Sequence, residues 1–145
     1  MQKMRQIATL SPEQIDHAWE FAIPIEGENP ELVKHDFVGA RIHKDKYNIE
    51  EEYGWYVEYI FSKEFLEKHA TTEASVFCKA NVRVLYFKNL IKNANNPVRE
   101  LVCSYIDQNG CNVKQPIAPV HVLSPEHLKE LTDIYGLSFE IINSL

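Results

Sequence analysis

The side chains that most often bind metal ions or transfer protons lie along this chain without a recognisable spacing. The six histidines form neither an H-x-x-x-H nor an H-E-x-x-H pattern. Cys78, Cys103 and Cys111 include no C-x-x-C pair, which argues against a zinc ribbon and against a disulfide framework. Residues 107–110 (DQNG) lack the alternating oxygen ligands and the distal glutamate of a calcium loop, so a hairpin turn is the better interpretation. Any chemistry must come from another arrangement.

Three segments between Tyr53 and Asn96 form the most distinctive pattern: GWYVEYI at 54–60, NVRVL at 81–85 and FKNLIKN at 87–93. This order resembles the HNH endonuclease family, in a subgroup common in bacteria that reads roughly Y-G-W-E-I-D-H-I, N-L-x-P-L and W-x-N-N-x-x-K. Upstream, GARI at 39–42 and Tyr47-Asn48 are similar to that subgroup's G-A-x-I and Y-G. The resemblance covers about residues 36–96, less than half of the chain.

The resemblance implies a ββα unit that holds one divalent cation against a phosphate, with a histidine as the base that activates water. The family's metal-binding Asp falls on Glu58 and its general-base His on Tyr59. The Asn that braces the hairpin is Asn81, and the first Asn of the helix is Asn89. The second helix position, a metal ligand, falls on Leu90, which cannot bind a cation. A phenol with an ordinary pKa of about 10 is a poor base at neutral pH. We therefore expect a degenerate site with no catalytic residue intact, no metal and no cofactor.

The predicted function is a degenerate HNH-like domain that has lost nuclease activity and binds nucleic acid or protein. Six basic residues in or near the resembling region could form a nucleic-acid-binding face: Arg41, Lys44, Lys46, Arg83, Lys88 and Lys92. The net charge of -6 and the run of glutamates at 50–52 weigh against such a face, because they repel phosphate.

Two alternatives stay open. One is an active, metal-dependent HNH nuclease with a rearranged site, which would need a divalent cation and a replacement base such as His43 or His69. The other is a small acidic interaction protein, of the immunity or phage-encoded type, that binds a basic partner. The net charge fits the second alternative, although no motif requires it.

Hydrophobic spacing and turn residues predict the elements that would position these side chains. The sequence SPEQ at 11–14 is a capping box that starts a helix ending before Pro24. A short helical turn is expected at 31–35, strands at 37–43 and 53–61, and a short helical or irregular segment at 63–69. After an extended piece at 82–84, the pattern at 85–93 predicts the helix of the ββα unit.

The C-terminal third predicts a hairpin and a helix. A strand at 100–106 is followed by an Asn-Gly turn and a returning strand at 111–113. Ser124-Pro125 starts a helix that runs to about Tyr135, and Gly136 ends it. The fold class is therefore α+β, an HNH-like ββα core with an N-terminal helix and a C-terminal β-hairpin plus helix.

Length and composition fit one globular domain spanning residues 1–145, with 45% hydrophobic and 25% charged residues. No window approaches the ~18 apolar residues of a membrane span, so no membrane partner is expected. The first ten residues hold no apolar run long enough for a signal peptide, and a cytoplasmic location is the default expectation. The sequence predicts no particular oligomeric state.

Overall fold

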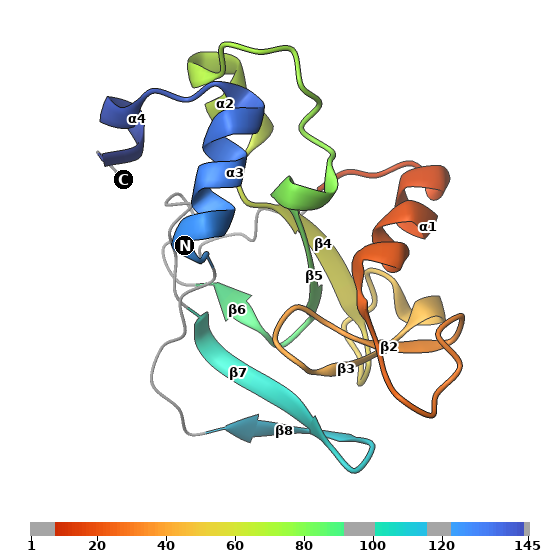
Figure 1. Ribbon diagram of the computed structural model, residues 1–145. Helices are drawn as coiled ribbons and strands as arrows, with labels where there is room; N and C mark the ends of the chain where they lie inside the picture. Colours follow the sequence, from red (N-terminus) through yellow and green to blue (C-terminus); the bar gives the residue numbers. More distant parts are fainter. Residues whose placement is uncertain (1–7, 92–100, 116–122, 144–145) are drawn as a thin grey trace.

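The computed structural model describes residues 8–91, 101–115 and 123–143, and within these it leaves the side chains of 90, 91 and 101–103 undescribed. Figure 1 shows a pair of central strands, β4 and β5, with α1 on one side of it. The helices α2, α3 and α4 gather at one end of the molecule, and the β7–β8 hairpin lies at the other. The α+β class predicted from the sequence is confirmed.

The N-terminal helix α1 spans Pro12–Phe21 and begins as the sequence predicts. The Ser11 hydroxyl accepts a hydrogen bond from the Gln14 N–H, and the Gln14 side chain accepts one from the Ser11 N–H. These two bonds satisfy backbone donors that a helix N-terminus otherwise leaves unpaired. Ala18 and Trp19 are the buried residues of this helix, and Trp19 packs against Trp55 of β4 with ring centroids 5.3 Å apart.

The central pair consists of β4 (Trp55–Tyr59) and β5 (Val82–Tyr86), which are antiparallel with Val57 opposite Val84. Successive strand side chains point to opposite faces. One face carries Trp55, Val57, Val82, Val84 and Tyr86, which form the first core cluster together with residues of α1. The predicted strand at 53–61 is confirmed, although it is shorter than expected.

A second core cluster lies between α2 (Lys63–His69), α3 (Pro125–Tyr135) and the end of β4. Leu131 and Tyr135 of α3 are fully buried in it. The predicted bounds of α3 are confirmed: the Ser124 hydroxyl accepts from the His127 N–H, and Gly136 ends the helix with a left-handed φ of 61°. The short helix α4 (Phe139–Asn143) follows.

The region predicted as a helical turn at 31–35 and a strand at 37–43 is a small antiparallel sheet. Its strands are β1 (Ile23–Pro24), β2 (Val33–His35) and β3 (Arg41–His43), in that order. The helical turn is wrong, and of the predicted strand at 37–43 only residues 41–43 are confirmed, because residues 37–40 form a loop. The Asp36 carboxylate causes the reversal, because its Oδ1 accepts hydrogen bonds from the backbone N–H groups of residues 38, 39 and 40.

The helix predicted at 85–93 is also wrong over its described residues. Strand β5 continues to Tyr86, residues 86–89 form a turn closed by the Asn89 N–H and the Tyr86 carbonyl, and β6 (Leu90–Ile91) follows. Residues 92 and 93 lie outside the described part of the chain. Strand β6 pairs with β7, so the backbone here is bonded in a sheet and not in a helix. Residues 85–91 therefore do not supply the helix that a ββα unit requires.

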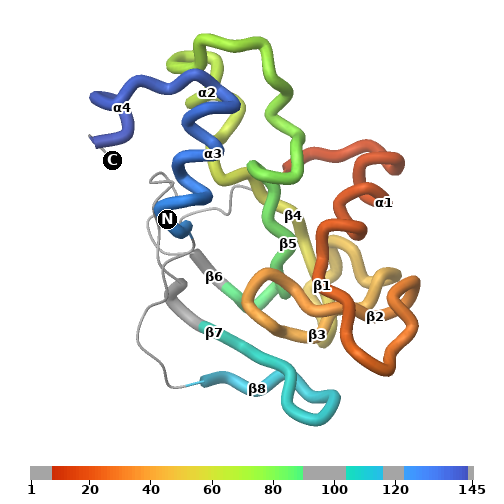
Figure 2. The backbone as a smooth tube through the Cα atoms, in the orientation of Figure 1, coloured from red at the N-terminus to blue at the C-terminus, as the bar shows by residue number. Residues whose placement is uncertain are grey.

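The predicted C-terminal hairpin is confirmed. Strand β7 (Leu101–Gln108) pairs antiparallel with β8 (Cys111–Gln115) in a sheet ordered β6–β7–β8. Asn109 and Gly110 both have positive φ, as a two-residue hairpin turn needs. Two 3₁₀ turns, η1 (Lys44–Lys46) and η2 (Lys79–Asn81), complete the described elements. Figure 2 traces the path between them. Among the described helices, none has the length and apolar character that crossing a membrane would take.

Candidate functional site

The residue at the family's metal-binding position, Glu58, lies inside the protein. It stands opposite Arg83 on the neighbouring strand, and Oε1 of Glu58 is 2.7 Å from Nη2 of Arg83. Their side chains are only 3% and 0% exposed. Within the described part of the chain, Nε and Nη1 of Arg83 find no hydrogen-bond partner. Removing Glu58 would leave the Arg83 guanidinium buried without this counter-charge. Glu58 therefore acts in the core and does not face an open metal site.

Tyr59, at the family's general-base position, is held on the opposite face of β4. It is half-buried and packs against the first core cluster. Burial raises the pKa of the Tyr59 phenol above its ordinary value, because the charged phenolate is poorly solvated there. A phenol with a raised pKa holds its proton more firmly, so even less of the phenolate that could act as a base is present at neutral pH. Glu58 and Tyr59 therefore do not converge on one reaction centre.

Asn81 braces the backbone around the end of β4. Its side chain is fully buried. Its Oδ1 accepts from the Phe61 N–H at 2.8 Å, and its Nδ2 donates to the carbonyls of Phe61 and Val76, each at 3.0 Å. These bonds join the end of β4 to the loop before η2. The bonds to Phe61 and Val76 are made to backbone, which is a structural use.

Asn89 belongs to a buried polar network centred on Asp36. Oδ2 of Asp36 accepts from the Tyr86 N–H at 2.8 Å and from Nδ2 of Asn89 at 2.9 Å. Asn89 also pairs with the backbone of Tyr105, accepting its N–H at 2.6 Å. Burial raises the pKa of Asp36, while hydrogen bonds from the Tyr86 N–H, the Asn89 amide and the backbone N–H groups of residues 40 and 39 oppose that rise. The network joins the β2–β3 loop, β5 and β7. The side chain of Leu90, the remaining predicted site residue, is not described.

Two of the six predicted nucleic-acid-binding residues, Arg83 and Arg41, form ion pairs within the protein. Arg83 is buried in the ion pair with Glu58, so it cannot reach a phosphate backbone. The Arg41 side chain is 15% exposed and lies between two carboxylates, 2.9 Å from Glu28 and 3.4 Å from Asp107. Sequence reasoning missed both pairings, because the partners lie on other strands or loops.

The other four predicted residues differ in their surroundings. Nζ of Lys44 lies 3.8 Å from Asp16, and Nζ of Lys46 lies 3.5 Å from Glu51. Lys88 is exposed. Lys92 lies outside the described residues. The structure therefore does not bring the five described side chains of this set together as one open basic face.

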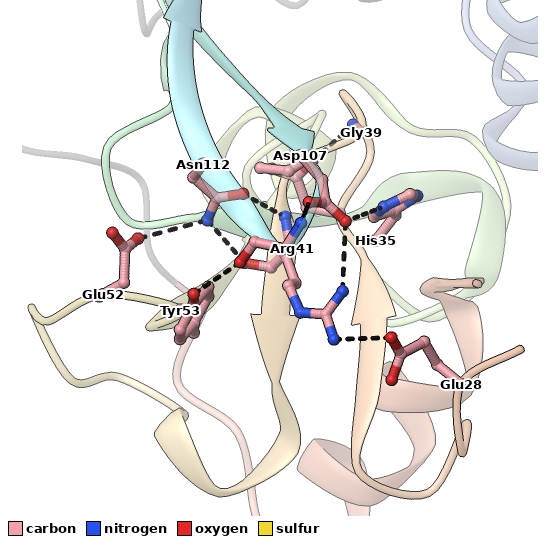
Figure 3. A network of polar contacts seen from close by, with 11 residues as sticks. Glu28, His35, Gly39, Arg41, Glu52, Tyr53, Asp107 and Asn112 are labelled. Carbon is pink, nitrogen blue, oxygen red and sulfur yellow. Dashed lines mark hydrogen bonds and ion pairs between the residues drawn. The ribbon is translucent and has the colours of Figure 1, made fainter. Parts of the chain in front are cut away.

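A second polar network joins the β1–β3 sheet to the β7–β8 hairpin (Figure 3). Oδ2 of Asp107 lies 3.0 Å from Nε2 of His35 and 3.4 Å from Nη1 of Arg41, and its Oδ1 accepts from the Gly110 N–H at 2.9 Å. Burial alone would raise the pKa of Asp107. The hydrogen bonds from His35 and Gly110 and the charge of Arg41 outweigh it, so the pKa of Asp107 is lowered.

The same network includes a side chain that pairs with backbone. Oδ1 of Asn112 accepts from the Arg41 N–H at 2.6 Å, and its Nδ2 donates to the Arg41 carbonyl at 2.8 Å (Figure 3). The Tyr53 hydroxyl donates to the Gly110 carbonyl at 2.7 Å. No sequence pattern indicated these contacts, which join residues 57 to 72 positions apart. Among the described residues, no three histidine, cysteine or acidic side chains are grouped so that they could hold a metal ion. We interpret the network as a clamp between two sheets.

The first third of the described chain carries an excess of exposed carboxylates. We call these ten side chains the acidic surface: Glu13, Asp16, Glu20, Glu26, Glu28, Glu31, Asp45, Glu50, Glu51 and Glu52. Contacts hold their segments together, because Trp19 of α1 donates to the Pro30 carbonyl and Asp16 pairs with Lys44. Figure 2 shows α1 and the loops beside β1, β2 and β3 on one side of the molecule. The lysines and arginines among 8–53 are either buried or half-buried.

Comparisons with protein-family models, with curated proteins and with solved structures give no match. The resemblance to HNH endonucleases therefore rests on the sequence motifs alone.

Proposed function

We propose that this protein is a binding domain and not a nuclease, as expected for a degenerate HNH-like domain, and that its partner is a protein with a basic surface. One observation carries the first part: Glu58, at the metal-binding position, is 3% exposed and lies 2.7 Å from the guanidinium of Arg83. A carboxylate paired in this way cannot bind a cation without leaving Arg83 buried and unpaired. Tyr59, on the other face of the strand, supplies no base.

The acidic surface supports the second part of the proposal. Ten exposed carboxylates attract a basic partner over distances of about a Debye length and increase its rate of association. Two of the six basic residues that could have contacted nucleic acid, Arg83 and Arg41, are occupied by carboxylates of this chain. The charge distribution therefore favours a basic protein over a polyanion.

Binding of a fluorescent lysine-rich peptide, followed by anisotropy at low and at high salt, tests the partner class. The double variant Glu26→Lys/Glu31→Lys changes exposed residues of the acidic surface. Its matched control is Glu126→Lys/Glu130→Lys, which makes the same change in net charge on exposed positions of α3. We expect the first variant to lose about tenfold in affinity at low salt and the control about twofold or less. Equal losses in both variants would show that only net charge matters and would contradict the proposed surface.

The alternatives are tested on the same protein. Plasmid incubated with Mg²⁺, Mn²⁺ or Zn²⁺ should remain intact. Cleavage that is lost in Glu58→Gln, a variant that keeps the size of the side chain, would establish an active nuclease. Salt-dependent retention on immobilised DNA or RNA would favour nucleic acid as the partner and contradict a basic protein.

A further inference from the structure

Strand β8 is an open edge of the sheet β6–β7–β8. In Figure 1 it lies at the margin of the molecule, and no other described element is drawn beyond it. The N–H groups of Tyr105 and Asp107 bond on the far side of β7, so their partners in register, Lys114 and Asn112, direct their backbone groups outward. In the described part of the chain these outward groups make no hydrogen bond. A row of unpaired backbone groups is a template for another strand.

This edge is fixed before any partner binds. The Asn112 side chain bonds the N–H and the carbonyl of Arg41 at 2.6 and 2.8 Å. At the tip of the hairpin, the Tyr53 hydroxyl donates to the Gly110 carbonyl at 2.7 Å. A strand held in this way loses little freedom on pairing, which lowers the cost of association.

The two faces of β8 carry groups that could complement a second copy. On one face the apolar side chain of Val113 is 38% exposed. On the other face Lys114 is exposed and, among the described residues, forms no ion pair. On that same face Nδ2 of Asn112 lies 3.5 Å from Oε1 of Glu52, a carboxylate held by the Tyr86 hydroxyl at 2.6 Å. A lysine and a carboxylate therefore stand near the same edge, at different positions along it.

We propose that β8 pairs antiparallel with β8 of a second copy, with the two-fold axis passing through Val113. Asn112 of each copy then lies opposite Lys114 of the other, and each of these pairs exchanges two main-chain hydrogen bonds. Lys114 lies beside Glu52 of the other copy on one face, and the two Val113 side chains meet on the opposite face. The result is one sheet that continues through both copies.

Charge selects this register over its neighbours. An axis through residue 112 would bring the two Glu52 carboxylates together, and an axis through residue 114 would place the two lysines directly opposite each other. Like charges in these positions destabilise a strand pair. A two-fold pair also uses the open edge of both copies, so the assembly closes as a dimer. The inference goes beyond the proposed function and requires no basic partner.

Sedimentation equilibrium of the protein between about 10 μM and about 1 mM tests the dimer, and we expect wild type to associate in this range. Val113→Lys places two like charges on the axis and should raise the dissociation constant about tenfold or more. The matched control Val113→Thr keeps a β-branched side chain and should change it about threefold or less. Circular dichroism checks that both variants fold. A wild-type monomer at every concentration, or equal dissociation constants for the two variants, would overturn the proposal.

Disulfide formation tests the register. In Cys111→Ser/Val113→Cys the introduced cysteines face each other across the axis, with Cα atoms about 4.5 Å apart, which a disulfide can span. The exposed native Cys111 would instead lie four positions, about 13 Å, along the strand from its copy. Under mild oxidation we expect a covalent dimer of the double variant and none of Cys111→Ser. Cross-linking of wild type as fast as that of the double variant would contradict an axis at Val113.

Discussion

Replacing Asp36 should be among the most damaging single changes in this domain. The carboxylate is fully buried and accepts five hydrogen bonds. Three come from the backbone at residues 38–40, one from the Tyr86 N–H at the end of β5, and one from the Asn89 amide on the turn that follows. In Asp36→Ala the Ala40 N–H, the Tyr86 N–H and the Asn89 amide lose their partner in the interior. Each buried donor left unsatisfied costs about 1–3 kcal/mol, so the three together cost about 3–9 kcal/mol. That loss is comparable with the whole stability of a typical domain, about 5–15 kcal/mol.

Asp36→Asn should be milder, because it replaces only one of the two carboxylate oxygens with a nitrogen. The amide oxygen can still accept from the loop at residues 38–40, but the amide nitrogen then faces the Tyr86 N–H and the Asn89 amide, which are both donors. We expect a loss of about 2–5 kcal/mol. Urea unfolding followed by tryptophan fluorescence measures both variants, since Trp19 and Trp55 are buried in the first core cluster.

Asp45→Ala provides the control, because Asp45 is exposed and should change stability by less than about 0.5 kcal/mol. The expected order of stability is wild type and Asp45→Ala, then Asp36→Asn, then Asp36→Ala. An Asp36→Asn protein as stable as wild type would refute the reasoning, since it would mean that two donors do not converge on Oδ2. An Asp36→Ala protein that loses less than about 1 kcal/mol would refute the buried network as a whole.

Three further predictions concern other parts of the fold. Gly54→Ala should lower the melting temperature far more than Gly110→Ala. A Cβ at Gly54 would overlap the Ile49 carbonyl oxygen, whereas a Cβ at Gly110 would meet open space. Gly110→Ala should therefore cost only about 1 kcal/mol of stability, the penalty that a positive φ imposes on alanine. The pKa of Asp107 is lowered by folding, so its contribution is complete above the unfolded value of about 3.9 and is lost as pH falls through the folded value. The stability difference between wild type and Asp107→Asn in urea should therefore shrink between about pH 6 and about pH 2. Glu58→Leu should lose about 3–5 kcal/mol in thermal unfolding because Arg83 stays buried without this counter-charge, and adding Arg83→Met should recover part of that loss.

The elements that the sequence predicted well are those whose signals come from residues close together in the sequence. The Ser11 capping box involves residues three positions apart, and the Asn109-Gly110 turn is set by two residues that tolerate positive φ. Helix α3 begins at a capping serine, Ser124, and ends at a left-handed glycine, Gly136. Each of these signals is complete within a few residues, so it can be read without knowing the fold.

The failures come from contacts between distant segments. The pattern at 85–93 suits a helix, but Asn89 is bonded to Asp36, 53 positions away, and to Tyr105, 16 positions away. Arg83 was expected at the surface because arginine usually lies there, and only its position opposite Glu58 accounts for its burial. The clamp around Asp107 had no sequence signal, since its members come from three separate segments.

The pairing of Asn112 with Arg41 bears on how the protein avoids aggregation. Strand β3 is the last strand of its sheet, and a free sheet edge can recruit a strand from another molecule. The Asn112 amide occupies both the N–H and the carbonyl of Arg41, as a neighbouring strand would. It thus covers the first residue of this edge strand with a single side chain, and the His43 N–H at its other end is bonded to the Tyr53 carbonyl. A variant that lost this amide would expose the edge while leaving both core clusters in place, so its defect would appear as self-association before unfolding.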